Sequence, residues 1–209
     1  MLGVVGLRLI SGGLLVSCTV PLATAIRFMS PGDRIGRKVK VMKTLVVYES
    51  FWGNTEQVAM AITQGLSAHG EVEMVEVSQA PTEITEPLDL IVIGGPTHAF
   101  SMTRASTRED AFKQGASRGS KTVGVREWLE HLHRGRHSEL VATFDTKVGK
   151  VRHLPGSAAR GAANVAHKLG YKTAAKPMSF YVQGVSGPLL AGELGRAQAW
   201  GERLGVAGR

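Results

Sequence analysis

The chain has 209 residues, 43% of them hydrophobic and 20% charged, which suits one folded domain with a tail and excludes both a wholly disordered chain and two full domains. Its formal net charge is +8, but residues 1–42 hold six of the 25 Lys and Arg residues and one of the 17 Asp and Glu residues. Since much of the excess lies in that segment, and no recognition helix or RNA-binding signature follows it, the charge does not indicate a nucleic-acid partner.

Cysteine and histidine are too few or too scattered to predict a metal centre. Cys18 is the only cysteine, so the chain forms no internal disulfide, no iron–sulfur cluster of its own and no Cys-based zinc site. The closest histidines are His131, His133 and His137, and residues two apart do not share a helix face. We therefore expect no metal, and a reducing cytoplasmic location suits such a chain.

Residues 1–42 are expected to be an N-terminal extension outside the folded domain. The stretch from Leu9 to Ile26 is almost wholly apolar or small, and Ala23-Thr24-Ala25 is typical of a signal-peptide cleavage site. Leu15-Val16-Ser17-Cys18 has the pattern of a bacterial lipoprotein acylation box. These features favour an exported or membrane-anchored protein, if residues 1–41 are translated and retained.

The same segment has a second interpretation. Two glycines and Pro21 interrupt the apolar stretch, which disfavours a helix of the roughly 20 residues needed to span a membrane. Met42 and Lys43 directly precede the first convincing strand, as the start of a small cytoplasmic protein would. Residues 1–41 are then an over-extended translation start.

Beyond Met42, short runs rich in Val, Ile and Leu alternate with segments of helical period, the pattern of βαβ units around a parallel sheet. We expect strand 44–48, helix 55–69, strand 72–77, strand 88–94, helix 123–134, strand 140–144, helix 157–169, strand 179–182 and helix 189–204. This order predicts an α/β fold, a doubly wound three-layer sandwich around a five-stranded parallel sheet of order 2-1-3-4-5.

Particular residues define these elements. Residues 44–48 form a continuous apolar run, as in a central strand covered on both faces, and Val58, Ile62 and Leu66 share one face of the first helix. Ser157 is a good N-cap for the Ala-rich helix, and Gly170 is a good stop for it. Residues 101–121 are polar without an apolar period, so we expect a long, mobile connection there.

In an open parallel sheet, ligands bind beyond the carboxyl ends of the strands, so the loops that follow the strands are candidate sites. The first loop, residues 49–55, joins a strand to a helix and places hydroxyls of Ser50 and Thr55 around Gly53 and Asn54. Backbone N–H groups and hydroxyls in such a loop can surround one anion at the helix N-terminus. A capped helix after a tight turn, held by Asn54 and Thr55, is the alternative.

This loop resembles the flavodoxin phosphate loop, T/S-x-T-G-x-T. Ser50, Gly53 and Thr55 match that pattern, while Trp52 replaces the middle Thr. The resemblance spans about residues 43–205 and implies that residues 43–209 form a flavodoxin-like FMN-binding domain. It also implies that the FMN 5′-phosphate is held by the loop Ser50, Phe51, Trp52, Gly53, Asn54 and Thr55, with the Trp52 N–H or backbone donors in place of the missing hydroxyl.

The second loop, residues 94–102, contains Gly-Gly-Pro-Thr-His-Ala-Phe. It resembles the loop G-x-P-T-[aromatic or basic]-x-[FY] that lines one face of the isoalloxazine ring in flavodoxins and related quinone reductases. The resemblance implies that Pro96, Thr97, His98 and Phe100 lie beside the ring, where flat contacts and a few donors are needed. The alternative for His98 is a loop histidine that faces water.

The third loop, residues 145–153, departs from the family pattern, which is often aromatic and acidic at this place. We assign Asp145 to the flavin site by its position, but Lys147, Lys150 and Arg152 make the loop basic. Positive charge near a flavin stabilises its anionic reduced form, so we expect a less negative reduction potential than in an acidic flavodoxin. A solvated basic loop is the alternative.

The resemblance implies an FMN-binding redox protein that transfers electrons through a non-covalently bound flavin. Its partners would be FMN and either redox proteins or NAD(P)H. Two alternatives stay open: an NAD(P)H-dependent quinone or protoporphyrinogen-type oxidoreductase of the same fold, and a non-catalytic module without cofactor. No Ser-His-Asp, paired-carboxylate or Cys nucleophile arrangement is visible, so we name no catalytic residue.

Overall fold

A computed structural model of the chain describes residues 41–208, so the predictions made for the N-terminal extension lie almost wholly outside the described residues. Its framework is one parallel sheet, built from β1 (Met42–Tyr48), β2 (Gly70–Glu76), β3 (Leu90–Pro96), β4 (Leu140–Val148), β5 (Lys172–Thr173) and β6 (Met178–Val182). No helix in this part of the chain is long and apolar enough to cross a membrane.

The strand order is β2-β1-β3-β4-β5, with β6 also paired to β4, and every pairing is parallel. The predicted 2-1-3-4-5 order is therefore confirmed. The fifth position is shared, because β5 pairs with the start of β4 at Leu140 and Val141, and β6 pairs with its end, from Phe144 to Val148. A sheet of six strands thus occupies the five expected positions.

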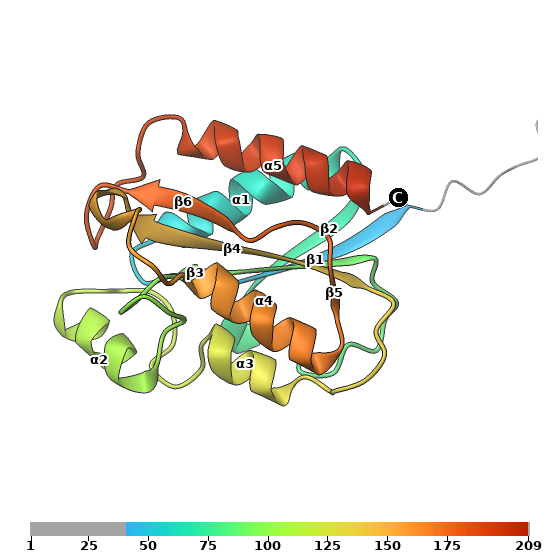
Figure 1. The fold of residues 1–209 in the computed structure, drawn as a ribbon, viewed down its shortest axis with the longest axis horizontal. Coiled ribbons are helices and arrows are strands. Elements are labelled where there is room, and N and C mark those ends of the chain that lie inside the picture. The colour runs from blue at the N-terminus through green and yellow to red at the C-terminus, as the bar shows by residue number, and fades with distance from the viewer. Residues whose placement is uncertain (1–40, 209) are drawn as a thin grey trace, which may run out of the picture. The chain divides into compact units, whose positions relative to one another are not determined.

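Helices cover both faces of the sheet, as in a three-layer sandwich. Figure 1 shows α1 (Asn54–Ser67) and α5 (Glu193–Ala207) on one face, and α3 (Val125–His131) and α4 (Ala158–Leu169) on the other. The remaining elements are α2 (Ala105–Lys113) and the short 3-10 helices η1 (Val77–Gln79) and η2 (Gly149–Val151). The expected N-cap at Ser157 and left-handed stop at Gly170 are both present in α4.

Each face of the sheet has its own hydrophobic core. Val46, Ile62, Phe144 and Trp200 belong to the core beneath α1 and α5, and a separate cluster around Trp128 lies beneath α3 and α4. The two helices α1 and α5 pack closely because glycines, which have no side chain, lie where their backbones meet. A Cβ on Gly65 would lie 2.2 Å from the carbonyl oxygen of Gln198, so even alanine would force these helices apart.

The prediction of a mobile connection over residues 101–121 is wrong, because helix α2 lies within it. No apolar helical period is visible there, since α2 has a mostly polar surface and buries only Arg108 and Ala111. Its stability comes from a buried charge that a search for apolar periodicity does not detect.

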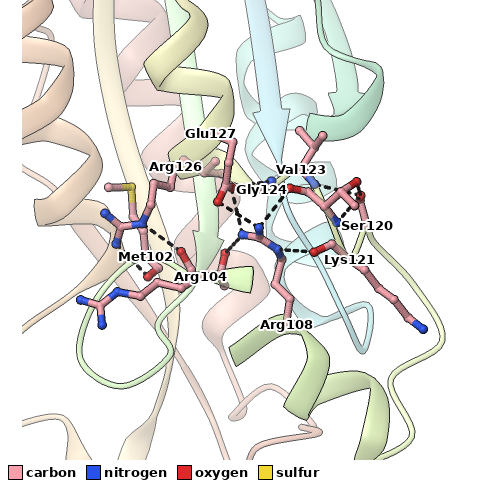
Figure 2. A network of polar contacts seen from close by, with 12 residues as sticks. Met102, Arg104, Arg108, Ser120, Lys121, Val123, Gly124, Arg126 and Glu127 are labelled. Atoms are coloured by element: carbon pink, nitrogen blue, oxygen red, sulfur yellow. Dashed lines mark hydrogen bonds and ion pairs between the residues drawn. The ribbon is translucent and has the colours of Figure 1, made fainter. Parts of the chain in front are cut away.

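Arg108 holds α2 to the rest of the domain through every N–H group of its guanidinium (Figure 2). Nη1 and Nη2 each donate to one carboxylate oxygen of Glu127 over 2.9 Å, in the paired geometry typical of strong Arg–carboxylate contacts. The other donations reach Thr103 Oγ1 and the carbonyl oxygens of Lys121 and Thr122. The Arg108 side chain is fully buried, and its charge is compensated on all sides.

Glu127 serves two elements at once. Besides pairing with Arg108, its Oε2 accepts a hydrogen bond from the backbone N–H of Gly124, which caps the start of α3. The Arg108 guanidinium is the principal group that holds the pKa of Glu127 below its usual value, against the opposing effect of burial. The pair therefore fixes α2, α3 and the segment between them as one unit.

We expect Arg108→Ala to lower the free energy of unfolding by about 3–5 kcal/mol, because it leaves the Glu127 carboxylate without its buried partner. Urea denaturation of the full chain measures this. Lys113→Ala is the matched control on the same helix, since Lys113 pairs with Asp110 at the exposed surface, and it should cost less than about 1 kcal/mol. Equal losses in the two variants would contradict the importance of the buried pair.

Candidate functional site

A pocket of about 280 Å³ lies where the strands β1, β3 and β4 end. This is close to the lower limit of about 300–1,000 Å³ typical of small-molecule sites. Its walls come from the loop after β1, the loop after β3, the end of β4, helix α2 and the segment after β6. They are formed by Ser50, Phe51, Trp52, Asn54, Thr55, Pro96, Thr97, His98, Ala99, Thr107, Asp110, Ala111, Gln114, Thr146, Val148, Val182 and Val185.

The loop before α1 is shaped to expose backbone donors. Gly53, the N-cap of α1, has a left-handed backbone with φ of 82°, which favours glycine over any residue with a Cβ. Its N–H donates to Ser50 Oγ over 3.1 Å, and its carbonyl accepts from the N–H of Gln57 over 3.0 Å. The first N–H groups of α1, at Asn54 and Thr55, have no acceptor in a preceding turn and remain available at the end of the helix that adjoins the pocket.

Two buried hydroxyls add a further donor. Thr55 Oγ1 lies 2.8 Å from Thr146 Oγ1, at the end of β4. The two hydroxyls carry two protons, and the bond between them uses one, so the other is free to be donated to a ligand. Asn54 Nδ2 donates to the carbonyl of Ser186 over 3.0 Å, which fastens the segment after β6 beside the start of α1.

Aromatic rings form another part of the lining. The ring centroid of His98 lies 5.6 Å from that of Phe51 and 6.2 Å from that of Trp52. Phe51 is only 1% exposed and also packs edge-on against Phe112 of α2, so it supports the pocket from within the core. Burial lowers the pKa of His98, so its imidazole is largely neutral at neutral pH.

The structure brings most of the predicted site residues together, but not Gly53, Phe100 or Asp145. Gly53 shapes the first loop and does not line the pocket. The Phe100 side chain is 51% exposed, and its backbone lies against Gly156 of the next loop. Phe100 thus borders the site at the surface, and its assignment to the ring stays a prediction.

Asp145 is fully buried behind the pocket. Its Oδ2 accepts hydrogen bonds from Thr97 Oγ1 over 2.8 Å, from the N–H of Ala159 over 3.1 Å and from Ser157 Oγ. Thr97 Oγ1 in turn accepts from the N–H of Ala158 over 2.8 Å. Asp145 therefore orients Thr97 and the start of α4, and it reaches the pocket only through Thr97.

The basic third loop is shorter than expected, because β4 continues to Val148. Lys147 lies within this strand, is 5% exposed, and donates from Nζ to the carbonyl oxygens of Leu154 (2.8 Å) and Gly156 (3.0 Å). The sequence after Phe144 turns polar, so the continuation of the strand was not predicted. The hydrogen bonds from the buried ammonium hold the loop 149–157 against the strand.

The prediction that Lys147 brings positive charge to the site is wrong for the same reason. Side chains alternate along a strand, so Thr146 and Val148 line the pocket while Lys147 points away from it. Lys150 and Arg152 remain exposed on the loop beyond. The expected rise in reduction potential then rests on these two residues and stays a prediction.

Sequence reasoning missed the wall that α2 contributes. Thr107, Asp110, Ala111 and Gln114 follow a spacing of i, i+3, i+4 and i+7, which places them on one helix face toward the pocket. The same spacing was readable in the sequence, but three of these four residues are polar, and the apolar periodicity that indicates helices does not include them. Val182, at the end of β6, and Val185, in the turn that follows, were missed because the end of the last strand was not considered as a pocket wall.

Glu49 is a buried carboxylate at the start of the first loop. Its Oε1 accepts from Thr103 Oγ1 over 2.7 Å, and its Oε2 accepts from the N–H of Val125 over 3.2 Å. Thr103 also accepts from Arg108, so a chain of hydrogen bonds links the first loop to the pair that fixes α2. Burial raises the pKa of Glu49 to about 7, against smaller opposing effects of Thr103, Val125 and Arg108.

The raised pKa predicts a pH-dependent stability. The folded state keeps the proton of Glu49 up to about pH 7, whereas the unfolded state loses it near the usual pKa of 4.5. The resulting contribution to stability is therefore complete below pH 4.5 and is lost as the pH rises to about 7. Between about pH 5 and pH 8 we expect the free energy of unfolding of the wild type to fall by up to about 3 kcal/mol relative to that of Glu49→Gln. Urea denaturation of both proteins across this pH range measures the difference. Glu130→Gln, on the exposed face of α3, should show no such trend, and a pH-independent difference for Glu49→Gln would contradict the assignment.

The polar part of the lining fits a phosphate group rather than a metal. It offers N–H groups at the start of α1, a spare hydroxyl proton at Thr55 or Thr146, and a glycine at the one left-handed position of the loop. Within residues 41–208, no group of His, Cys, Asp or Glu side chains could hold a metal ion. The neutral aromatic and aliphatic surfaces of Trp52, His98 and Val148 suit a flat ring beside such an anion.

Comparison with known proteins identifies the fold. Flavodoxin 2 of Bacillus cereus superposes with a TM-score of 0.57 at 16% identity, covering 78% of this chain and 97% of its own. A Streptococcus pneumoniae flavodoxin gives 0.56 at 13% identity with coverages of 78% and 98%, and an archaeal flavodoxin 0.53 at 16% with 79% and 97%. No curated protein matches the sequence.

The sequence itself supplies an independent match. Residues 45–107, which run from β1 into α2, match a family model described as a flavodoxin domain. This segment contains the loop before α1 and the loop after β3, which form two walls of the pocket. Residues 45–107 are thus similar to a flavodoxin domain, and residues 41–208 share the fold of the flavodoxins.

Proposed function

We propose that the protein binds FMN in the pocket at the carboxyl ends of β1, β3 and β4 and transfers electrons through it. The observation that carries this proposal is the joining of two kinds of surface in one pocket. Backbone and hydroxyl donors lie at the start of α1, and aromatic and aliphatic side chains lie beside them. A phosphate ester attached to a flat ring system needs both.

The first surface would hold the phosphate without a lysine or arginine in the pocket lining. A helix N-terminus stabilises a nearby anion by roughly 0.3–2 kcal/mol, and hydrogen bonds to a charged acceptor contribute about 1.5–3 kcal/mol each. The Thr55–Thr146 pair and the N–H groups of Asn54 and Thr55 supply several such bonds. Trp52, which replaces a family hydroxyl, lines the same pocket and offers an indole N–H.

The second surface would hold the flavin ring, and the flavin would supply the electron-accepting chemistry. The neutral imidazole of His98 and the indole of Trp52 give flat contacts, and Val148 and Val182 provide aliphatic ones. Thr97, oriented by the buried Asp145 carboxylate, presents a fixed polar group at the same edge. The protein's own part is thus to bind, orient and shield the cofactor.

Loss of the Thr55 hydroxyl tests the phosphate assignment. We expect Thr55→Ala to weaken FMN binding by about 10- to 150-fold, because it removes one hydrogen bond to a charged group. Titration of the full chain with FMN, followed by quenching of flavin fluorescence, measures this. Thr55→Ser keeps the hydroxyl and should bind within a few-fold of the wild type.

Two further variants locate the phosphate. Gly53→Val forces a Cβ into a left-handed backbone and should weaken FMN binding strongly, whereas Lys150→Ala, at an exposed cation, should change it little. If all three substitutions had equal effects, the phosphate would lie elsewhere. A full chain that leaves free-flavin fluorescence unchanged would support the alternative of a cofactor-free binding module.

A further inference from the structure

The surface around the pocket mouth differs in charge from the rest of the domain. Four connections meet at this edge of the sheet, residues 49–53, 97–124, 149–157 and 183–192 (Figure 1). Their exposed Lys and Arg residues outnumber their exposed acids, Glu109 and Asp110, by six to two. The cations are Arg104, Lys113, Arg118, Lys121, Lys150 and Arg152.

The opposite edge of the sheet shows no such excess in the two segments beside the start of β1 and the end of α3. Residues 82–89 and 132–139 carry two exposed acids, Glu83 and Glu86, against two exposed cations, Arg134 and Arg136. The connections around the pocket therefore produce a positive field that these two segments do not. A field of this kind orients an oppositely charged partner during its approach.

Exposed apolar side chains lie among these cations. Phe100 is 51% exposed, Leu154 46%, Val185 59% and Leu190 38%, and all four belong to the connections around the pocket. Single exposed apolar residues are ordinary, but a group of them around one opening is typical of a protein-binding surface.

The connections form one continuous rim. The backbone of Phe100 lies against Gly156, so the loop after β3 touches the loop after β4. Leu190 Cδ1 lies 3.1 Å from the position that a Cβ on Gly149 would occupy, so the loop after β4 also touches the segment after β6. Arg118 lies against Gly53 and pairs with Glu56, which places the segment after α2 beside the start of α1.

We infer that this basic, partly apolar rim docks an acidic redox protein, which exchanges electrons with the cofactor in the pocket. The inference rests on the proposed function, because a redox partner must bring its own centre to the pocket mouth. Nucleic acid and lipid surfaces would satisfy the charge but would supply no electron. The interspersed acids and apolar residues also favour a protein surface with a matching pattern of charges.

A binding measurement with two small redox proteins tests the charge complementarity. At about 10 mM salt, where screening is weak, we expect isothermal titration calorimetry to detect binding of the full chain to an acidic plant-type [2Fe–2S] ferredoxin. We expect no binding to a basic cytochrome c. Binding should weaken steeply as salt is added. Failure of the ferredoxin to bind, or equal binding of cytochrome c, would overturn the inference.

Charge reversal locates the surface. The double variant Lys121→Glu/Arg152→Glu changes two rim residues outside the pocket lining and should weaken ferredoxin binding about tenfold or more. The matched control, Lys168→Glu/Lys172→Glu, makes the same change in net charge at exposed residues by the opposite edge and should weaken binding less than about twofold. Equal effects would mean that only net charge matters and would overturn the inference.

Further measurements identify the class of partner and distinguish partner binding from cofactor binding. Duplex DNA or phosphatidylglycerol vesicles that bind as tightly as ferredoxin, with the same loss in the rim variant, would show a general polyanion surface and contradict a protein partner. Unchanged FMN affinity in the rim variant, measured by flavin fluorescence, would support a surface separate from the cofactor site. Ferredoxin binding by a chain that does not bind FMN would refute the proposed function while leaving the surface intact.

Discussion

Parallel pairing of β1, β3 and β4 is the constraint on which the site depends. In a parallel sheet, the carboxyl ends of neighbouring strands meet at one edge, so three loops far apart in the sequence are brought around one opening. The hydrogen bond between Thr55 and Thr146 joins the start of α1 to the end of β4 across that opening. Without this register, the backbone donors at Asn54 and Thr55 and the aromatic contacts at His98 would belong to separate surfaces.

Buried charge, rather than apolar area, completes the pocket. Arg108 binds Glu127 and so joins α2 to α3. Arg108 also donates to Thr103, which in turn donates to Glu49 at the start of the first loop. Buried ion pairs add little stability unless all their hydrogen bonds are made, and here the guanidinium makes all of them. The wall that α2 adds to the pocket is therefore as firmly placed as the strand ends, although the helix itself has little apolar surface.

The sequence predicted those features that periodicity and local backbone rules decide. The loop from Ser50 to Thr55 and the helix limits at Ser157 and Gly170 follow from short-range patterns, and the strand order follows from the doubly wound fold that alternating strands and helices indicate. It did not predict what depends on long-range pairing: the helix stabilised by Arg108, or the burial of Lys147 by carbonyl groups from a later loop. Polar residues that find distant partners look like loop residues until the fold is known.

We propose that bound FMN places its phosphate at the start of α1 and its flat ring beside His98. Backbone amide NMR of the isotope-labelled full chain, titrated with FMN, measures where the cofactor binds. We predict that the largest shift changes fall on the amides of Gly53, Asn54 and Thr55, with further changes at His98 and Thr146. Saturable changes confined to other residues, or no changes at all, would contradict the claim.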